Sequence, residues 1–490
     1  MTPVDYLELA LTFSTELVLL VTLGLVLFLD LRGWLGSTLA VRSQRGATLT
    51  AVGLVLAGGV LLTFPPVADA PAGSFVLTQT TLWVKLALLG LSLASVLLLA
   101  GSEITEHVGE FCALFLLATE GLLLMVGAEN LLMLFVALEL SSLSLYALTA
   151  LNRRHPDASE AALKYFLIGS TAAAGTLFGL SLLYGLTGTL QFSLLTARIG
   201  SHIGDPLLWA GLALTLAGFA FKVAAVPFHT WAPDVYQVAP GPAAALVAAG
   251  SKLAGFLVLL RLLHAGLAPI PGTASGLPFQ SGWMPAVALL AVASMAVGNL
   301  AALAQTRVRR LLAWSAIAQA GYALVGILGP TTDATLAVQY FAFTYGLAVV
   351  GLFGVLEALA AAGESDEISS LAGLWRRSPL LAVCFTTFVL SLAGIPPLAG
   401  FLGKFFLFVA ALKRGQPLDH LWLVAVALGF SVVSLYYYLK LLKPVLVADP
   451  APEVRPLPVP RLLALTLVVL AAAVLVLGIF PTLLLGSGTL

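Results

Sequence analysis

The sequence predicts an all-α polytopic membrane protein, and three observations lead to this fold class. Hydrophobic residues make up 60% of the chain and charged residues only 9%, whereas about 25% is usual for a soluble domain. The mean hydropathy is +1.05. The apolar residues form repeated runs of about 20, which is the length that an α-helix needs to cross a bilayer. Loops between these runs are short, as at 128–129 and 330–333, so we expect one membrane domain without large extramembrane parts.

About fourteen apolar runs are long enough to be transmembrane spans. The first run carries Glu16 and is preceded by no lysine or arginine, which favours a retained helix over a cleavable signal peptide. In chain order the predicted spans are 14–30, 47–64, 82–100, 111–127, 130–151, 163–187, 206–236, 242–264, 283–304, 308–329, 334–362, 379–413, 421–442 and 461–485.

Two of these spans are unusually long, and proline interrupts both. Span 7 contains Pro227, and span 12 contains the pair Pro396 and Pro397. Because proline removes a backbone donor and clashes with the preceding turn, each span is expected to be two half-helices. The breaks lie five spans apart. Because five is an odd number, two consecutive copies of a five-span repeat enter the membrane from opposite sides. Matched broken helices in inverted halves indicate the ion site of a transporter.

The predicted organisation is therefore two inverted five-helix repeats flanked by additional helices. Spans 4–8, residues 111–264, form the first repeat, and spans 9–13, residues 283–442, form the second. Residues 1–110 add three helices before the repeats, and residues 461–490 add one after them.

The distribution of arginine and lysine predicts how the helices are oriented. Most basic residues outside the spans follow odd-numbered spans, as Arg153, Arg154 and Arg376 do, whereas Arg198, Lys413 and Arg414 follow even-numbered spans. Cytoplasmic loops carry the excess of positive charge. Both termini are thus expected on the non-cytoplasmic side of the membrane.

Several ionisable residues lie deep within apolar runs, where a charge costs about 2.5–3.5 kcal/mol on insertion scales and normally faces a partner or a wet cavity. The deepest are Glu139 in span 5, Lys222 in span 7, Lys252 in span 8 and Lys404 in span 12. Small neighbours of Lys252 leave room for water. Together these four residues predict a line of proton-exchanging groups. Snorkelling to an interface is the alternative for Lys222, and a static ion pair is the alternative for Glu139.

Further ionisable residues give weaker signals. His229 follows the break in span 7 and can relay a proton near neutral pH, although a hydrogen-bonded structural role fits almost as well. Lys164 opens span 6, where an interfacial position is equally compatible with the sequence. Lys85, Arg261 and Lys440 lie near span ends and are interpreted as snorkelling side chains, and Glu120 and Glu357 have no partner that the sequence identifies. These last five residues lie within or near the ends of apolar helices.

Composition and motifs exclude several classes of function. The 23 basic and 23 acidic residues cancel, which gives no electrostatic basis for nucleic-acid binding. Cys112 and Cys384 are the only cysteines, too few to ligate an iron–sulfur cluster, and no His/Cys/Asp group has metal-ligand spacing. Neither a phosphate-binding loop nor a dinucleotide-binding glycine motif is present. The chain itself is therefore predicted to hold no cofactor and no metal.

Five long motifs resemble the antiporter-like subunits of bacterial respiratory complex I, the proton-translocating NADH–quinone oxidoreductase. They are FKVAAVPFHTWAPDVYQ (221–237), AAGSKLAGF (248–256), TRVRRLLAWSAIAQAGY (306–322), EISSLAGLWRRSPLLA (367–382) and LSLAGIPPLAGFLGKFFLF (390–408). The resemblance is close over spans 4–13 and looser over spans 1–3. Lys404 favours the subunit N branch, because the sibling subunit M usually has glutamate there.

The resemblance implies a central polar axis with Glu139 paired to Lys222, a central Lys252 and Lys404 beside the second broken helix, supported by Lys164, His229, Pro227, Pro396 and Pro397. It implies that separating Glu139 from Lys222 sends a proton by way of Lys252 towards Lys404. Two departures stand out: residues 238–242 read VAPGP where the family usually reads GAPTP, and Gln319 replaces the histidine of some relatives.

The expected partners are the lipid bilayer and other membrane-arm subunits, including neighbouring antiporter-like subunits. Flavin, iron–sulfur clusters and quinone are expected in those partner subunits, and the expected location is the bacterial cytoplasmic membrane. Alternative functions are a subunit of a multisubunit cation/proton antiporter or membrane-bound hydrogenase, a stand-alone solute carrier, or a structural scaffold in which the buried lysines are dispensable.

Overall fold

The computed structural model describes residues 11–34, 36–63, 75–100, 105–152, 155–274, 280–414, 419–448 and 457–485, and every long element in these ranges is an α-helix. Thirteen of the helices are long and apolar enough to cross a membrane. The predicted span 12 is present as two shorter apolar helices, α17 (Pro379–Ala393) and α18 (Ala399–Leu412), which agrees with the proline break. The all-α polytopic fold class is confirmed.

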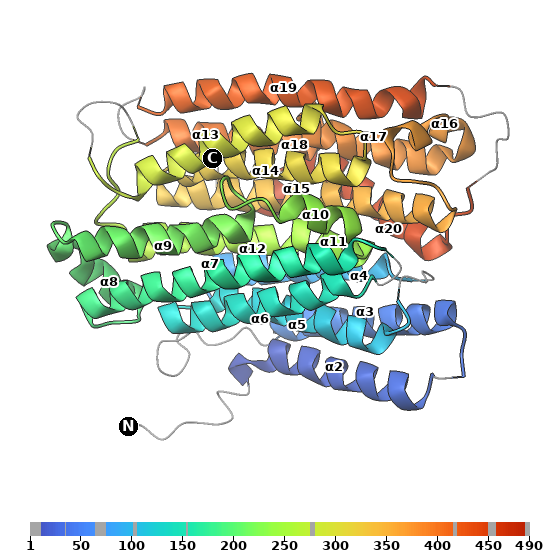
Figure 1. The fold of residues 1–490 in the computed structure, drawn as a ribbon, viewed down its shortest axis with the longest axis horizontal. Coiled ribbons are helices and arrows are strands. Elements are labelled where there is room, and N and C mark those ends of the chain that lie inside the picture. The colour runs from blue at the N-terminus through green and yellow to red at the C-terminus, as the bar shows by residue number, and fades with distance from the viewer. Residues whose placement is uncertain are drawn as a thin grey trace. The chain divides into compact units, whose positions relative to one another are not determined.

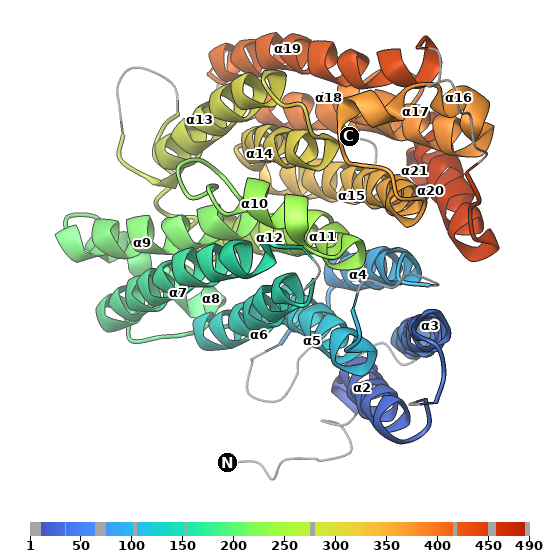
Figure 2. The ribbon, with the colours of Figure 1, turned by 45° about the vertical axis from the view of Figure 1, so that its right-hand side comes forward.

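The first compact unit comprises Met1–Phe219 and Val238–Ile270. It contains α2 (Ser14–Arg32), α3 (Leu39–Thr63), α4 (Gln79–Leu97), α5 (Val108–Gly127), α6 (Leu131–Ala150), α7 (Ala158–Thr187), α8 (Phe192–Ile199), η2 (Gly200–His202), most of α9 (Pro206–Val223), α11 (Gly241–Ala248), α12 (Gly250–Arg261) and η3 (Leu262–Gly266). Figure 2 shows α2 and α3 of this unit side by side, in blue.

The second unit comprises Ala220–Gln237 and Pro271–Leu490. After the end of α9 it contains α10 (Ala232–Val238), α13 (Trp283–Leu303), α14 (Val308–Ile327), α15 (Thr331–Ala361), η4 (Ile368–Leu371), α16 (Leu374–Arg377), α17, α18, α19 (Leu421–Leu446), α20 (Arg461–Ile479) and α21 (Thr482–Leu485). Within this unit α13, α14, α15 and α19 run nearly parallel to one another in Figure 1.

Local sequence signals explain where several helices begin and end. The Asn130 side chain accepts a hydrogen bond of 2.7 Å from the backbone of Met133 and so caps the start of α6. Thr78 caps α4 in the same way, through the backbone of Thr81. At the end of α7, Gly188 adopts the left-handed conformation (φ 63°), which glycine permits without a steric penalty. Helix α3 begins at Leu39, before the predicted residue 47, since its first turns are polar and escaped the apolar-run criterion.

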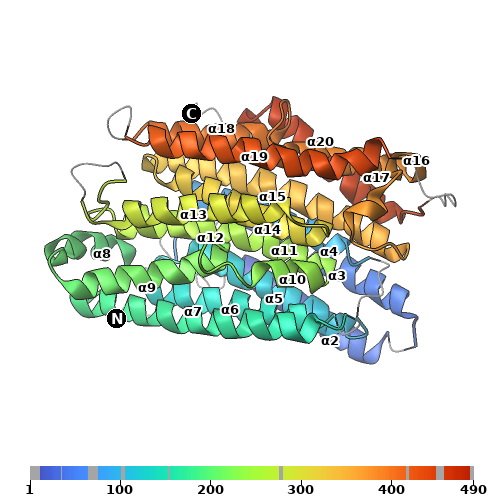
Figure 3. The same ribbon diagram turned by 45° about the horizontal axis from the view of Figure 1, so that its top comes forward.

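Glycines bring neighbouring helices into close contact. A Cβ atom added at Gly298 of α13 would lie 2.5 Å from the backbone nitrogen of Ala318 on α14, so only glycine fits. Figure 3 shows these two helices side by side. In the first unit, a Cβ at Gly121 of α5 would lie 2.4 Å from the backbone nitrogen of Ser141 on α6. Close backbone approach through small residues is the usual packing mode of membrane helices.

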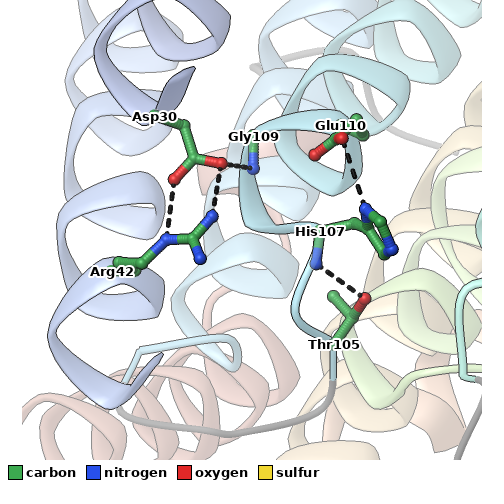
Figure 4. Close-up of polar contacts among 6 residues, drawn as sticks. All are labelled: Asp30, Arg42, Thr105, His107, Gly109 and Glu110. Atoms are coloured by element: carbon green, nitrogen blue, oxygen red, sulfur yellow. Dashed lines mark hydrogen bonds and ion pairs between the residues drawn. The ribbon is translucent and has the colours of Figure 1, made fainter. Parts of the chain in front are cut away.

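A buried carboxylate joins three helices of the first unit. Asp30, near the end of α2, receives hydrogen bonds from Nε (3.0 Å) and Nη2 (2.8 Å) of Arg42 on α3, and a third of 2.9 Å from the backbone nitrogen of Gly109 on α5 (Figure 4). The bidentate guanidinium contact fixes the geometry of the pair. These three hydrogen bonds hold the end of α2 against the starts of α3 and α5.

Candidate functional site

The first broken helix has its break at the position that proline predicts. Helix α9 ends at Val223, the chain turns over 224–231, and α10 begins at Ala232. Ala224 has a positive φ of 59°, and the peptide bond before Pro227 is cis. The backbone nitrogen of Val226 donates a hydrogen bond of 2.9 Å to Oγ of Ser294 on α13, which satisfies a donor that the break leaves without a helical partner.

Lys222 lies in the last turn of α9, immediately before this break, and is only 4% exposed. The last carbonyl groups of a helix give its C-terminus a partial negative charge, which stabilises a cation. His229 follows in the turn, with its ring centroid 5.5 Å from the Trp314 ring on α14 and its Nδ1 atom buried without a hydrogen-bond partner among the described residues. The break therefore brings a buried lysine and a buried histidine into one segment of the second unit.

The second broken helix follows the same plan. Helix α17 ends at Ala393, Gly394 has a positive φ of 84°, and the peptide bond between Pro396 and Pro397 is cis. Helix α18 begins at Ala399, and the backbone nitrogen of Gly400 donates to Oγ of Ser391 at 3.1 Å. A side chain from the first half-helix thus satisfies a donor of the second.

Lys404 on α18 returns to the end of α17. Its Nζ atom lies 3.4 Å from the carbonyl oxygen of Ala393, 3.3 Å from Oγ of Ser431 on α19 and 5.0 Å from the ring centroid of Tyr322 on α14. The side chain is 5% exposed. A helix-end carbonyl, a hydroxyl and an aromatic face thus favour the ammonium form of Lys404, whereas its burial disfavours that form.

A small cavity adjoins Lys404 within the second unit. It is lined by residues that include Gln319, Thr344, Tyr345 and Ser391, and its volume of about 10 Å³ is at the threshold for one water molecule. Nε2 of Gln319 donates to the carbonyl oxygen of Leu392 (3.1 Å) and to the Tyr438 hydroxyl (3.3 Å). At the position where some relatives have histidine, this chain therefore places an amide that donates to the end of α17.

A buried polar network beside Lys404 has no counterpart in the sequence prediction. Asn299 on α13 donates to the Tyr322 hydroxyl at 3.2 Å and accepts from the Tyr437 hydroxyl at 3.1 Å. Tyr437 packs on Tyr438 with ring centroids 4.6 Å apart, and Tyr438 in turn contacts Gln319. All five side chains are buried. In the sequence only Gln319 had drawn attention, and Asn299 was a lone asparagine in an apolar run.

The remaining predicted site residues belong to the first unit and differ in burial. Lys252 is 3% exposed and lies on the first turn of α12, just after the one-residue interruption between α11 and α12 at Ala249. Glu139 lies near the middle of α6 and is partly exposed. Lys164 is exposed on α7, and its Nζ atom lies 2.7 Å from the carboxylate of Glu160 one turn earlier. Unlike the buried lysines, it is therefore a surface residue with a carboxylate partner on its own helix.

The division of the chain distributes the four axis residues between the units. Glu139 and Lys252 belong to the first unit, whereas Lys222 and Lys404 belong to the second. The structure brings Lys222 and His229 together in one break, and it brings Lys404 together with Gln319. The Glu139–Lys222 pairing and the transfer path stay predictions.

Three interpretations of charged residues need correction or completion. Lys85 was expected to snorkel, but it is buried on α4, and its Nζ atom lies 2.7 Å from Oε1 of Glu16 on α2. A buried carboxylate from a distant helix, rather than the interface, compensates its charge. Glu357, which lacked a partner in the sequence, pairs with Arg309 at 2.5 Å, and Arg261 contacts Glu129.

No group of three or more His, Cys, Asp or Glu side chains within the described ranges is placed to hold a metal ion. Cys112 lies on α5 and Cys384 on α17, and both thiols are free. The polar groups that the second unit gathers beside its second break are instead lysine, amide and hydroxyl groups.

Comparison with known proteins gives one consistent family. The transmembrane family described as "NADH:quinone oxidoreductase/Mrp antiporter" matches residues 128–432. NADH-quinone oxidoreductase subunit N 2 of Acidobacterium capsulatum is 45% identical over 99% of both chains. Subunit N of Desulforamulus reducens is 37% identical over 96% of this chain and 95% of its own length.

Solved structures agree with these sequence matches. A chain of respiratory complex I from Thermus thermophilus superposes with a TM-score of 0.77 at 35% identity, covering 96% of this chain and 98% of the other. A chain of the Mrp complex from Dietzia reaches a TM-score of 0.83 at 23% identity, over 99% and 96% of the two chains, and shows the shared fold. The chain is thus an integral membrane protein that belongs to the NADH-quinone oxidoreductase subunit N family, within the NADH:quinone oxidoreductase/Mrp antiporter group.

Proposed function

We propose that this chain is a proton-translocating membrane-arm subunit of an NADH–quinone oxidoreductase. Its partners would be the neighbouring membrane-arm subunits, including other antiporter-like ones, while flavin, iron–sulfur clusters and quinone bind to partner subunits. The membership of the subunit N family over nearly the whole chain supports this assignment. The observation that carries it is the pair of broken helices, each with a buried lysine at the break or beside it.

The proposed mechanism uses buried lysines as sites that hold a proton in turn. A charge or conformational change that follows quinone reduction separates Glu139 from Lys222, and Lys222 then releases its proton towards Lys252. The proton passes to Lys404 and leaves on the non-cytoplasmic side. A lysine at bilayer depth retains its proton only while neighbouring groups compensate the charge, so moving one compensating group is sufficient to release it.

Water and polar side chains complete the proposed path near its end. The one-water cavity beside Lys404 and the hydroxyl groups of Ser391 and Thr344 offer hydrogen-bonding steps next to the lysine. Breaks in α9–α10 and α17–α18 would stand in equivalent places of the inverted repeats 111–264 and 283–442. Both termini would lie outside the cytoplasm. Arg153 and Arg154, whose positive charges support this orientation, lie outside the described residues.

The experiment that tests this function compares proton pumping with NADH–quinone turnover in membranes that contain the assembled complex with Lys222→Ala. We expect assembly to be retained and pumping to be lost. The matched control is Lys413→Ala, because Lys413 is an exposed lysine that pairs with Asp333 outside the breaks. Wild-type pumping from the assembled Lys222→Ala complex would contradict the proposed function, and pumping that requires sodium would favour a cation/proton antiporter.

A further inference from the structure

Three buried ionisable side chains lie on helices of the first unit that pack together, and none of them belongs to the proposed axis. They are Glu16 on α2, Lys85 on α4 and Glu120 on α5, with exposed fractions of 3%, 5% and 4%. None of them is among Glu139, Lys222, Lys252 and Lys404. Three helices therefore bring ionisable groups into an apolar interior, where each isolated charge is costly.

The geometry of this cluster leaves an oxygen atom on each of its two carboxylates without a hydrogen bond. Nζ of Lys85 donates to Oε1 of Glu16 at 2.7 Å. Oε2 of Glu120 and Oε2 of Glu16 are buried and have no hydrogen-bond partner among the described residues. The helices packed against α5 also carry Glu139, Lys252 and Arg261, but the groups whose charge acts on Glu120 are Glu16 and Lys85.

The charges of the cluster do not balance unless a proton is present. Two carboxylates and one ammonium sum to one negative charge in a buried site. A buried, uncompensated charge is strongly unfavourable, and an ionisable group in such a place takes up or releases a proton instead. One proton on Glu120 makes the cluster neutral and leaves the short Glu16–Lys85 ion pair intact.

The cluster lies beside the helix that carries Glu139. Glu120 directly precedes Gly121, the residue at which α5 comes so close to α6 that an added Cβ would lie 2.4 Å from the backbone of Ser141. Glu139 is two residues before Ser141 on α6. Next to Glu120, the Thr119 hydroxyl donates to Oγ of Ser92 on α4 at 3.2 Å, so polar contacts continue along the interface of α4 and α5.

We propose that Glu120 and the Glu16–Lys85 ion pair form a second proton-binding site, which holds one exchangeable proton and takes part in translocation. On loading, a proton from water forms the O–H bond of the Glu120 carboxyl group. On release, that bond breaks and the proton returns to water. Lys85 is then the one cation for two carboxylates, so the released state carries one net negative charge and is the less stable of the two. This inference rests on the proposed function only where it says that the site takes part in translocation. Proton binding at Glu120 is independent of Lys222.

The test uses the complete complex with Glu120→Gln, which keeps the shape of the side chain but cannot exchange a proton. The control is Glu110→Gln, which changes an exposed glutamate on the same helix. We expect Glu120→Gln to remove one carbonyl stretching band of a protonated carboxyl group, and this band should shift when wild-type complex is transferred to D₂O. We also expect less proton pumping per NADH oxidised, with NADH–quinone turnover retained. The control should change neither quantity.

Either an unchanged infrared spectrum or wild-type pumping in Glu120→Gln would overturn the proposal. Should this variant not assemble, Glu120→Asp provides the same test, because a shifted carboxyl band supports the site and an unshifted band overturns it. Lys222→Ala measured in parallel separates the two proposals. If Lys222→Ala pumps normally, the proposed function fails on that result, whereas the infrared band decides independently whether Glu120 holds a proton.

Discussion

The Nζ atom of Lys404 lies 5.0 Å from the ring centroid of Tyr322, so a buried ammonium group faces the π-surface of an aromatic ring. The same ring carries the hydroxyl that accepts a hydrogen bond from Asn299. Tyr322 therefore connects the lysine of the second broken helix to the polar network that joins α13, α14 and α19.

The first prediction separates the ring of Tyr322 from its hydroxyl group. Tyr322→Phe keeps the aromatic face and should retain the contact with Lys404, whereas Tyr322→Leu removes it. Cation–π contacts contribute roughly 0.5–2 kcal/mol, depending on desolvation. We expect Tyr322→Leu to lower the thermal stability and proton pumping of the assembled complex more than Tyr322→Phe does. Equal effects of the two variants would show that the ring does not stabilise the ammonium.

The second prediction concerns the buried ion pair of Glu16 and Lys85. Lys85→Met leaves the Glu16 carboxylate buried without its partner, which costs about 3–5 kcal/mol in comparable pairs. The double variant Glu16→Leu/Lys85→Met removes both charges and should recover most of this loss. The amount of folded subunit in the membrane and its resistance to denaturant measure the difference. A double variant as unstable as the single one would contradict the prediction.

The third prediction tests the close contact of α5 and α6. Gly121→Ala places a Cβ 2.4 Å from the backbone nitrogen of Ser141, so the helices must move apart, and overpacking of this kind typically costs about 1–3 kcal/mol. Gly90→Ala on α4 is the matched control, since nothing lies within 4 Å of its added Cβ. Alanine there should be neutral or stabilising by about 0.5–1 kcal/mol. The unfolding temperatures of the two variants are compared. Equal temperatures would contradict the conclusion that α5 and α6 pack too closely for a Cβ at position 121.

The fourth prediction compares the left-handed residues at the two breaks. Gly394→Ala introduces a Cβ at φ 84° and 3.4 Å from Cδ of Lys404, and should cost about 1–2 kcal/mol while crowding the lysine. Ala224 already has a left-handed backbone conformation, with φ 59°. Ala224→Gly removes the steric cost of its Cβ there and should change the stability little. The unfolding temperature and the rate of proton pumping should both fall for Gly394→Ala. A larger loss for Ala224→Gly would refute this explanation of the breaks.

The sequence predicted the elements of the fold because their signals are local. Apolar runs of bilayer length became helices, and Pro227, Pro396 and Pro397 marked the two breaks. Burial of Lys222, Lys252 and Lys404 also followed from their depth in these runs, and the structure confirms it. Boundaries were less accurate where polar residues form the first turns of a helix, as in α3.

Partners across the chain could not be predicted in this way. Asn299 is a single polar residue in an apolar run, and its partner Tyr437 lies 138 positions away. Lys85 stands near the start of α4, where snorkelling is the usual interpretation, but its partner Glu16 comes from a helix 69 positions earlier. Such pairings depend on which helix faces pack together, and one sequence carries no periodic signal for that choice.

The ion pairs of α2 also have a consequence for biosynthesis. Ribosomes make α2 with its two buried carboxylates, Glu16 and Asp30, before Arg42 and Lys85 have been added to the chain. Glu16 lies in the first turn of α2 and Asp30 near its last, so both acids can reach the bilayer interface until their partners are made. Their burial in the folded unit therefore comes only after α3 and α4 have been added, which couples the final position of α2 to these two later helices.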